Sequence, residues 1–194
     1  MGRIKVHEFT TLDGSVGVPM WTVDFPWTPE QTEDTTALTA GATAILLGRT
    51  TYEMFAPAWS QRTVEDDPGA PFFNETPKYV VSSTLSDPGW GPATALAYDP
   101  ARIAALKDEV DGDLYVSGSG TLVRALIADG LVDELHLFVY PVGLGEGPYL
   151  FPPGHPRTTL ALLTSTAYDN GVLHLTYGPA PRQAEGGAST RGAD

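Results

Sequence analysis

The sequence predicts an α/β fold, in which a mostly parallel sheet is flanked by helices and closed by a C-terminal antiparallel hairpin. Short apolar runs typical of strands alternate with helical patterns along most of the 194 residues. Near the end of the chain, two strand patterns flank Tyr168-Asp169-Asn170-Gly171, and Asn-Gly is a typical hairpin turn. We therefore expect one domain over residues 1–178. Residues 179–194 lack large apolar side chains and are expected to form a disordered tail.

The N-terminal half contains two predicted strands and two predicted helices. Residues 4–11 have a strand pattern, followed by a turn at 12–14 and an irregular, aromatic loop over 16–28. Thr28-Pro29-Glu30 is a typical helix start, and this helix is expected to end at Gly41. Residues 44–47 predict a buried strand. Thr50 and Glu53 form a capping-box pattern that predicts a helix to about residue 58, and the acidic segment 60–75 is expected to be a solvated loop.

The C-terminal half continues the alternation. Strands are expected at 78–82 and 93–98, and a helix starts at Pro100 with an apolar stripe of Ile103, Leu106 and Val110. Residues 114–117 predict a strand, the glycine turn 118–120 breaks it, and a helix over 121–129 ends at Gly130. A strand at 134–140 and hairpin strands at 158–167 and 172–177 complete the pattern.

Three predicted strands end in groups that suit phosphate. These groups are Gly48-Arg49-Thr50, Ser82-Ser83-Thr84 and Gly118-Ser119-Gly120-Thr121. A helix start offers unpaired backbone N–H groups to an anion, and glycine lets an oxygen-rich group approach closely. Any one of them could be an ordinary turn. Because ligands of such sheets bind beyond the carboxyl ends of the strands, three at one edge indicate a dinucleotide.

Composition excludes several classes of protein. The formal net charge of −13 argues against a nucleic-acid surface or an anionic membrane as partner. Cysteine is absent, and the four histidines show no metal-ligand spacing, so we expect no metal site. No apolar run approaches the roughly 20 residues of a membrane span, so a soluble, cytoplasmic protein is expected. There is no Gly-x-Ser-x-Gly motif of a serine hydrolase, and no pair of carboxylates indicates a glycosidase.

Four segments resemble the dihydrofolate-reductase-like superfamily, in the branch that includes the reductase domain of riboflavin biosynthesis. They are TTLDGSVG (10–17), LLGRTTYEMF (46–55), YVVSSTL (79–85) and SGSGTLVRALIADGLVDELHLFVYPVGLGEGPYLF (117–151). The resemblance implies an NADPH-dependent reductase of the dihydrofolate reductase or 5-amino-6-(5-phosphoribosylamino)uracil reductase type. It would transfer hydride to a small heteroaromatic or imine/carbonyl substrate, pterin- or aminopyrimidine-like. The alternative is a non-catalytic, nucleotide-binding dimeric relative of the fold.

The resemblance also implies which residues bind NADPH. In the family, the first strand end meets cofactor phosphates, the second takes the adenosine side with its 2′-phosphate, and the glycine turn takes the pyrophosphate. A guanidinium can form a fork to phosphate oxygens, although Arg49 could instead form a surface ion pair. The residues assigned in this way are Gly48, Arg49, Thr50, Ser82, Ser83, Gly118, Ser119, Gly120, Thr121 and Leu122.

The proton donor is less clearly indicated. Folate enzymes carry a carboxylate on the first helix, and the corresponding position here is Gln31, which argues against folate reduction. Glu33, Asp34 and Asp13 are the catalytic candidates, with Glu30 also nearby. Acids in the first turn of a helix are also favoured by its dipole alone.

The substrate side is expected at the aromatic loop. Trp21, Phe25 and Trp27 could wall a flat substrate, or they could be core packing. A phosphorylated substrate would need a further cation, for which Arg124 and Arg3 are available. In the glycine-rich loop 141–151, backbone shape rather than Glu146 is expected to matter. Relatives form homodimers, and the face of strand 134–140 that carries His136, Phe138 and Tyr140 is a candidate contact.

Overall fold

The structure is a computed structural model that describes residues 2–181. The part of the predicted tail from residue 182 onward lies outside the described residues. The elements follow in the order β1 (Ile4–Thr11), the 3-10 helix η1 (Met20–Asp24), α1 (Pro29–Ala40), β2 (Ala42–Gly48), α2 (Arg49–Trp59), α3 (Ala70–Glu75), β3 (Lys78–Val81), β4 (Ala93–Leu96), α4 (Pro100–Glu109), β5 (Asp113–Ser117), α5 (Gly120–Ala128), β6 (Glu134–Tyr140), β7 (Leu160–Ala167) and β8 (Leu173–Pro179).

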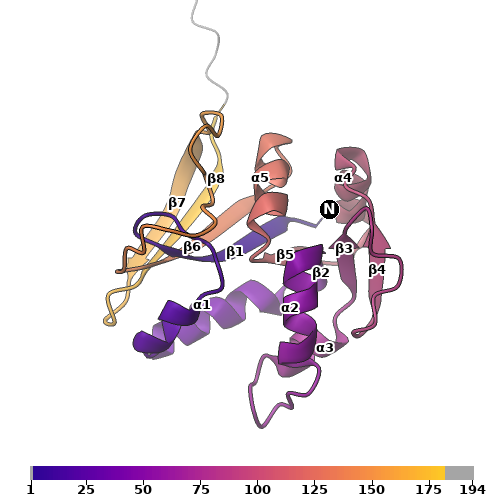
Figure 1. Ribbon diagram of the computed structural model, residues 1–194, viewed down its shortest axis with the longest axis horizontal. Helices are drawn as coiled ribbons and strands as arrows, with labels where there is room; N and C mark the ends of the chain where they lie inside the picture. The colour runs from indigo at the N-terminus through magenta and orange to yellow at the C-terminus, as the bar shows by residue number, and fades with distance from the viewer. Residues whose placement is uncertain (1, 182–194) are drawn as a thin grey trace, which may run out of the picture.

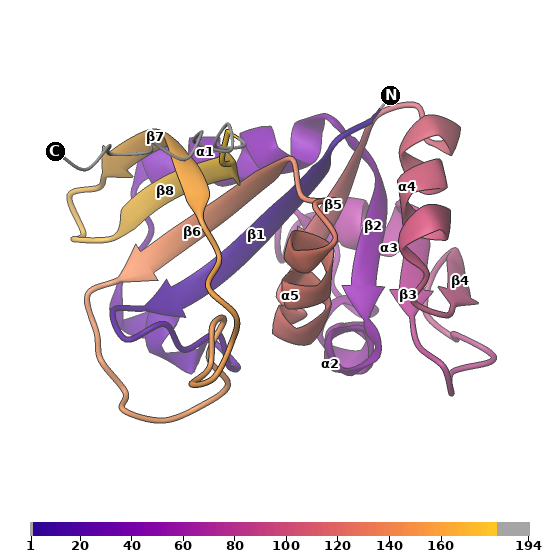
Figure 2. The ribbon, with the colours of Figure 1, turned by 90° about the horizontal axis from the view of Figure 1, so that it is seen from above.

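The strands form one eight-stranded sheet in the order β4-β3-β2-β5-β1-β6-β8-β7. The first six are parallel, β8 pairs antiparallel with β6, and β7 pairs antiparallel with β8. The predicted α/β class with a closing hairpin is therefore confirmed. Since the parallel strands share a direction, β1, β2, β3, β5 and β6 end at the same edge of the sheet, and the arrowheads of β1, β2 and β6 all point to the lower side of Figure 2.

Helices cover both faces, as predicted. In Figure 1, α4 and α5 lie above the sheet and α1, α2 and α3 lie below it. Ile4, Val6, Leu114 and Val116 pack with α4 and α5 on one face. On the other face, buried aromatic and aliphatic side chains of β2, β5 and β6 pack with α1, α2 and α3. No helix within residues 2–181 is long and apolar enough to cross a lipid bilayer.

Two local predictions were wrong. The capping box at Thr50 is not used, because α2 begins at Arg49 with Gly48 as its N-cap, and Glu53 pairs with Arg49 instead. The segment 60–75 is not entirely loop, because α3 forms at its end. Burial drives this helix: Phe73 stacks on Trp59 with ring centroids 4.2 Å apart, a tertiary contact that the sequence pattern did not show.

Other boundaries moved by a few residues. β8 continues to Pro179, beyond the predicted domain limit at residue 178, because its pairing with β7 runs to Leu160↔Pro179. The loop 16–28, expected to be irregular, contains η1. The helix start at Thr28 is confirmed, since its side chain accepts a hydrogen bond from the Gln31 N–H.

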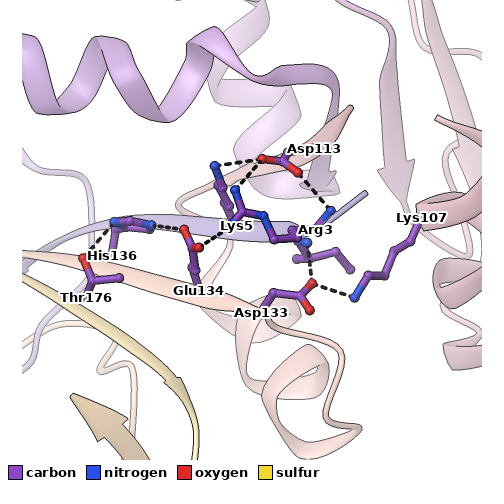
Figure 3. A network of polar contacts seen from close by, with 9 residues as sticks. Arg3, Lys5, Lys107, Asp113, Asp133, Glu134, His136 and Thr176 are labelled. Carbon is purple, nitrogen blue, oxygen red and sulfur yellow. Dashed lines mark hydrogen bonds and ion pairs between the residues drawn. The ribbon is translucent and has the colours of Figure 1, made fainter. Parts of the chain in front are cut away.

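The proposed dimer face of β6 is covered within the chain, so that prediction was wrong for these residues. Phe138 and Tyr140 are fully buried, and His136 is 7% exposed. His136 contacts Glu134 through Nε2 and His174 through Nδ1, and Thr176 also contacts Nδ1. Figure 3 shows this row of polar groups along β6 towards Arg3 and Asp113. Its ion pairs lie at the start of the parallel strands, opposite the strand ends.

Candidate active site

The N-termini of α2 and α5 meet at the carboxyl-end edge of the sheet. The Gly48 N–H donates to Ser119 Oγ at 2.9 Å, and Ser119 Oγ donates to Thr51 Oγ1 at 2.9 Å. One serine hydroxyl thus connects the ends of β2 and β5. The two turns that are predicted to bind phosphate, 48–50 and 118–121, therefore form one surface.

The glycine turn has the backbone shape of an anion-binding concavity. Gly118 and Ser119 adopt left-handed conformations, with φ of 55° and 64°, before the right-handed helix α5 begins. Such a left-to-right sequence turns successive N–H groups to the same side. Neither α2 nor α5 has a side-chain N-cap. Within residues 2–181, no hydrogen bond is found from the N–H groups that open the two helices; these are Thr50, Thr51, Ser119, Gly120, Thr121 and Leu122. The N–H of Arg49 belongs instead to the β2–β3 pairing, in which Gly48 lies opposite Val81.

Arg49 extends the site to the end of β3. Its NH1 donates to Thr84 Oγ1 at 2.5 Å, and its Nε donates to Glu53 Oε1 at 2.7 Å. The surface ion pair that was the alternative for Arg49 therefore occurs, and Arg49 also contacts the loop 82–84. Ser82 Oγ accepts from the N–H groups of Thr84 and Leu85, which shapes this loop.

These residues fit a phosphorylated dinucleotide. Unpaired N–H groups and a half-exposed guanidinium are the donors that phosphates require. A Cβ at Gly120 would lie 3.1 Å from Val16 Cγ2, and one at Gly118 would be strained by its φ of 55°. The glycines thus keep the backbone accessible. These observations support the predicted cofactor residues by placement, and their contact with NADPH stays a prediction.

The aromatic loop lies over the ends of β1 and β6. Phe25 meets Tyr140 edge-on with centroids 5.5 Å apart, and Trp27 meets Phe9 at 6.0 Å. Trp21 packs against the same buried cluster. Ring contacts thus join two of the predicted substrate residues, Phe25 and Trp27, to Phe9 and Tyr140, and Trp21 packs on the larger core beside them. We define the aromatic cluster as Phe9, Trp21, Phe25, Trp27 and Tyr140. Trp27 remains 44% exposed.

His7 lies beside this cluster and was not predicted as a site residue. Its ring centroid is 4.6 Å from that of Phe9, and its Nδ1 is 2.5 Å from Tyr115 Oη. His7 is 5% exposed, and its Nε2 has no partner within the described residues. Burial lowers the pKa of His7 to about 3, helped by His136 and His174, so the imidazole is neutral near pH 7. A histidine inside a strand pattern gave no signal of this role.

Glu8, the next residue, was also missed. It points to the opposite face of the sheet from His7, because successive strand side chains alternate. Glu8 is 2% exposed, and its Oε1 has no partner in the part of the chain that the structure describes. Burial raises its pKa to about 8, partly offset by Arg124. Arg124 itself donates to Tyr149 O and to Thr121 Oγ1, next to the glycine turn.

The predicted acid Asp13 connects two loops through hydrogen bonds. It accepts hydrogen bonds from the Thr11 hydroxyl and from the N–H groups of Leu144 and Gly145. The Thr11 bond, followed by the backbone bonds, lowers the pKa of Asp13, although the carboxyl is exposed. It therefore connects the turn after β1 to the loop after β6.

The two predicted acids of α1 differ. Glu33 is exposed, whereas Asp34 Oδ2 accepts from Tyr168 Oη at 2.5 Å and lies 3.1 Å from His174 Nδ1. Burial works to raise the pKa of Asp34, but its bonds with Tyr168 and His174 prevail and lower it. Gln31 is fully buried, where it donates to Tyr140 Oη and accepts from Asn170. The side chains of Asp34 and Gln31 are thus both engaged with other side chains of the protein.

Two open grooves lie away from this edge. One, of about 500 Å³, is lined by Leu135, Leu137, Tyr177 and the loop from Phe151 to Thr158. The other, of about 580 Å³, lies between Tyr52 on α2 and Gly89–Gly91. Neither contains the unpaired N–H groups or the aromatic cluster, so we locate the candidate site by its chemistry rather than by groove volume.

Comparison with known proteins identifies the family and the fold of the chain. A family model described as the RibD C-terminal domain matches residues 3–91 and 98–174. The uncharacterized protein YyaP of Bacillus subtilis (strain 168) is 35% identical over 76 residues, which is 39% of this chain and 40% of that relative. The chain thus matches only about two fifths of the curated relative.

Three solved structures share the fold. A predicted riboflavin biosynthesis protein from Shewanella sp. PV-4 has a TM-score of 0.76 at 20% identity, over 93% of this chain and 100% of that one. A pyrimidine reductase-like protein from Corynebacterium diphtheriae has 0.62 at 14%, over 93% and 92%. Dihydrofolate reductase from Enterococcus faecalis, complexed with NADP(H) and RAB-propyl, has a TM-score of 0.58 at 16% identity, over 91% of this chain and 96% of that one.

Proposed function

Since this chain belongs to the RibD C-terminal domain family, we propose that it is an NADPH-dependent reductase. It would transfer hydride to a small heteroaromatic or imine/carbonyl substrate of the pterin or aminopyrimidine kind. The observation that carries the proposal is the joined pair of uncapped helix N-termini at Gly48 and Ser119. Their unpaired N–H groups lie next to the guanidinium of Arg49, whose positive charge suits a phosphate.

Each part of the site has a role in this proposal. The turn 118–122 holds the pyrophosphate, while Arg49, Ser82 and Ser83 hold the adenosine side with its 2′-phosphate. NADPH supplies the hydride when it is bound. The aromatic cluster excludes water and orients a planar substrate at the ends of β1 and β6.

Isothermal titration calorimetry of wild type and Arg49→Ala with NADPH and NADH tests this. Loss of a fork to phosphate oxygens should weaken NADPH binding by roughly tenfold to a hundredfold, and NADH binding much less. Arg102→Ala is the matched control, because Arg102 is an exposed guanidinium paired with Glu109 on α4. Equal losses for both nucleotides would remove the 2′-phosphate role. No heat with either nucleotide on folded protein would reject the proposal.

A non-catalytic, nucleotide-binding relative is the second candidate. The observation that favours it is that two of the three predicted catalytic acids, Asp13 and Asp34, are engaged in hydrogen bonds within the chain. This candidate requires nucleotide binding without NADPH oxidation over a panel of pterins, pyrimidines and imines. Steady turnover of any panel member would rule it out.

We also propose a homodimer, which the family resemblance implies. The contact would not involve the inner face of β6, because α1 covers it. Size-exclusion chromatography with light scattering would give the mass of the protein in solution. A single species near the monomer mass of 20.6 kDa would contradict the dimer.

A further inference from the structure

The stretches of sequence that carry the aromatic cluster contain no positive side chain. Between Lys5 and Arg49 the chain has no Lys or Arg, but it has six Asp and Glu. No Lys or Arg occurs between Arg124 and Arg157, or in residues 158–181. These segments build the second half of β1, η1, α1, β6, β7 and β8. They include every member of the aromatic cluster.

The cations that border these segments are engaged elsewhere. Arg3 and Lys5 form ion pairs with Asp113 at the start of the strands, the edge opposite the candidate site (Figure 3). Arg124 donates to Tyr149 O and Thr121 Oγ1 beside the glycine turn. Arg157 lines the groove on the far side of β6. Among the residues that the structure describes, no Lys or Arg is shown in contact with the aromatic cluster.

His7, the titratable base next to the aromatic cluster, does not supply a positive charge in place of Lys or Arg. His7 is buried, and its pKa of about 3 keeps the imidazole uncharged near neutral pH. Its Nδ1 is engaged with Tyr115, so Nε2 is the ring atom left for a ligand. Exposed carboxylates flank the aromatic loop in the chain, since Asp24 precedes Phe25 and Glu30 follows Trp27 by three positions. The charged side chains that flank the aromatic loop are therefore acidic.

Aromatic rings at a negative rim favour an organic cation. A cation over the face of Trp, Tyr or Phe gains roughly 0.5–2 kcal/mol from the ring quadrupole. A phosphate at the same place would meet repulsion and would have no donor of opposite charge. The partly exposed Trp27 ring, held edge-on to Phe9, offers such a face.

We propose that the aromatic cluster binds a planar nitrogen cation without a phosphate group, such as an iminium or an N-alkylated heteroaromatic ring. This inference names the substrate class and rests on the proposed reductase function for its chemistry. It separates this chain from a reductase of phosphorylated ribosylamino-pyrimidines, which would need a cation at this end.

Reduction of a cationic imine also requires no proton donor, which agrees with the engagement of Asp13 and Asp34 in contacts within the chain. With a reduced nicotinamide as the reductant, its hydride forms a C–H bond at the carbon of the C=N⁺ group. The π electron pair of the C=N⁺ double bond moves to nitrogen, and the product is a neutral amine. No proton is consumed, so the reaction needs no acid at the positions of Asp13, Glu33 or Asp34.

Calorimetry without nucleotide tests the binding preference with three planar probes at pH 7.5. They are N-methylquinolinium, the neutral quinoline, and 1-naphthyl phosphate. We expect N-methylquinolinium to bind about tenfold more tightly than quinoline, and its affinity to fall with added salt. In the Arg49→Ala variant, which lacks the guanidinium of the candidate phosphate site, we expect 1-naphthyl phosphate to bind more weakly than N-methylquinolinium. Binding of the cation that is absent or no tighter than that of quinoline would overturn the proposal, as would tighter binding of the phosphate to this variant.

Matched variants locate the site. Trp27→Leu should weaken N-methylquinolinium binding by about tenfold, because the aromatic face is removed. Glu30→Lys should weaken it severalfold, whereas Glu65→Lys makes the same charge change in the distant loop 60–69 and should leave it within about twofold. Equal effects of the two charge reversals would contradict a local site. Thermal melts of each variant control for folding.

The same titrations separate this inference from the proposed function. If NADPH fails to bind but N-methylquinolinium shows the expected order, the reductase proposal fails while the cation site stands. If NADPH binds with the Arg49 dependence but the probes show no cation preference, only the substrate class is wrong.

Discussion

Ser119 Oγ accepts a hydrogen bond from the backbone N–H of Gly48 at 2.9 Å, across 71 positions of sequence. The same hydroxyl donates to Thr51 Oγ1. This contact brings the starts of α2 and α5 together without using the N–H groups that follow them. The N–H groups at the two helix starts thus form one surface that can donate hydrogen bonds. They stay available because the Ser119 side chain connects the helices without capping either one.

Replacing Ser119 by alanine should destabilise the protein and the nucleotide site together. Ser119→Ala leaves the Gly48 N–H and the Thr51 hydroxyl without their partner, which costs about 1–3 kcal/mol. We expect NADPH affinity to fall about tenfold, because the two helix starts are no longer held in register. Urea denaturation and calorimetry measure the two effects.

Ser119→Gly separates the hydrogen bond from the backbone strain. It also removes the hydroxyl, but glycine relieves a φ of 64° that costs a residue with a Cβ roughly 1–2 kcal/mol. The glycine variant should therefore be more stable than the alanine variant and yet bind NADPH equally weakly. A glycine variant with wild-type affinity would show that the hydroxyl does not position the site.

Glu8→Gln should stabilise the protein in a way that depends on pH. Burial raises the pKa of Glu8 to about 8 from an ordinary 4.5, with Arg124 acting in the opposite direction. The unfolded chain releases this proton near pH 4.5 and the folded chain retains it, so stability falls as pH rises from 4.5 towards 8. Glutamine removes that loss. At pH 7.5 we expect a gain of roughly 2–4 kcal/mol, and near pH 4 no difference.

Denaturation curves from pH 4 to 9 check this prediction. The acid side of the profile should persist in Glu8→Gln, because it belongs to His7. The lowered pKa of His7 means that the unfolded chain takes up a proton below about pH 6.5, which the folded chain refuses until about pH 3. Parallel profiles for wild type and variant over the whole range would show that Glu8 is not a buried neutral acid.

Asp34→Asn should loosen the hairpin, whereas Glu33→Gln should not. Asp34 accepts from Tyr168 and contacts His174, and removing a charged acceptor costs roughly 1–3 kcal/mol. Glu33 is exposed, so its change should stay within about 0.5 kcal/mol. Because the pKa of Asp34 is lowered, its contribution is present above about pH 4 and is lost as pH falls through the folded-state value.

The same pair of variants tests the catalytic candidates. If Asp34 only holds α1 against β8, Asp34→Asn should lower stability and leave the rate of NADPH oxidation per folded molecule within a few-fold. A rate loss of about a hundredfold with a changed pH profile would assign a catalytic role to Asp34. The corresponding loss in Glu33→Gln would assign it to Glu33 instead.

Local patterns predicted most of the fold. The Thr28 cap, the Asn170-Gly171 turn and the alternation of strands and helices each follow from neighbouring residues, and the structure confirms them. The failures had tertiary causes. The capping box at Thr50 is unused because α2 starts at Arg49, and α3 forms because Phe72 packs on the buried Tyr115 and Phe73 stacks on Trp59.

The sequence by itself determined the strand ends that carry Gly48, Ser82 and Gly118, and it determined the absence of cations between Lys5 and Arg49. Only the tertiary structure decided that Ser119 joins two helix starts, that the inner face of β6 is covered, and that His7 and Glu8 are buried and uncharged near neutral pH. The physical reason is that composition and turns are local properties, whereas burial and the pairing of polar groups depend on residues brought together from distant parts of the chain.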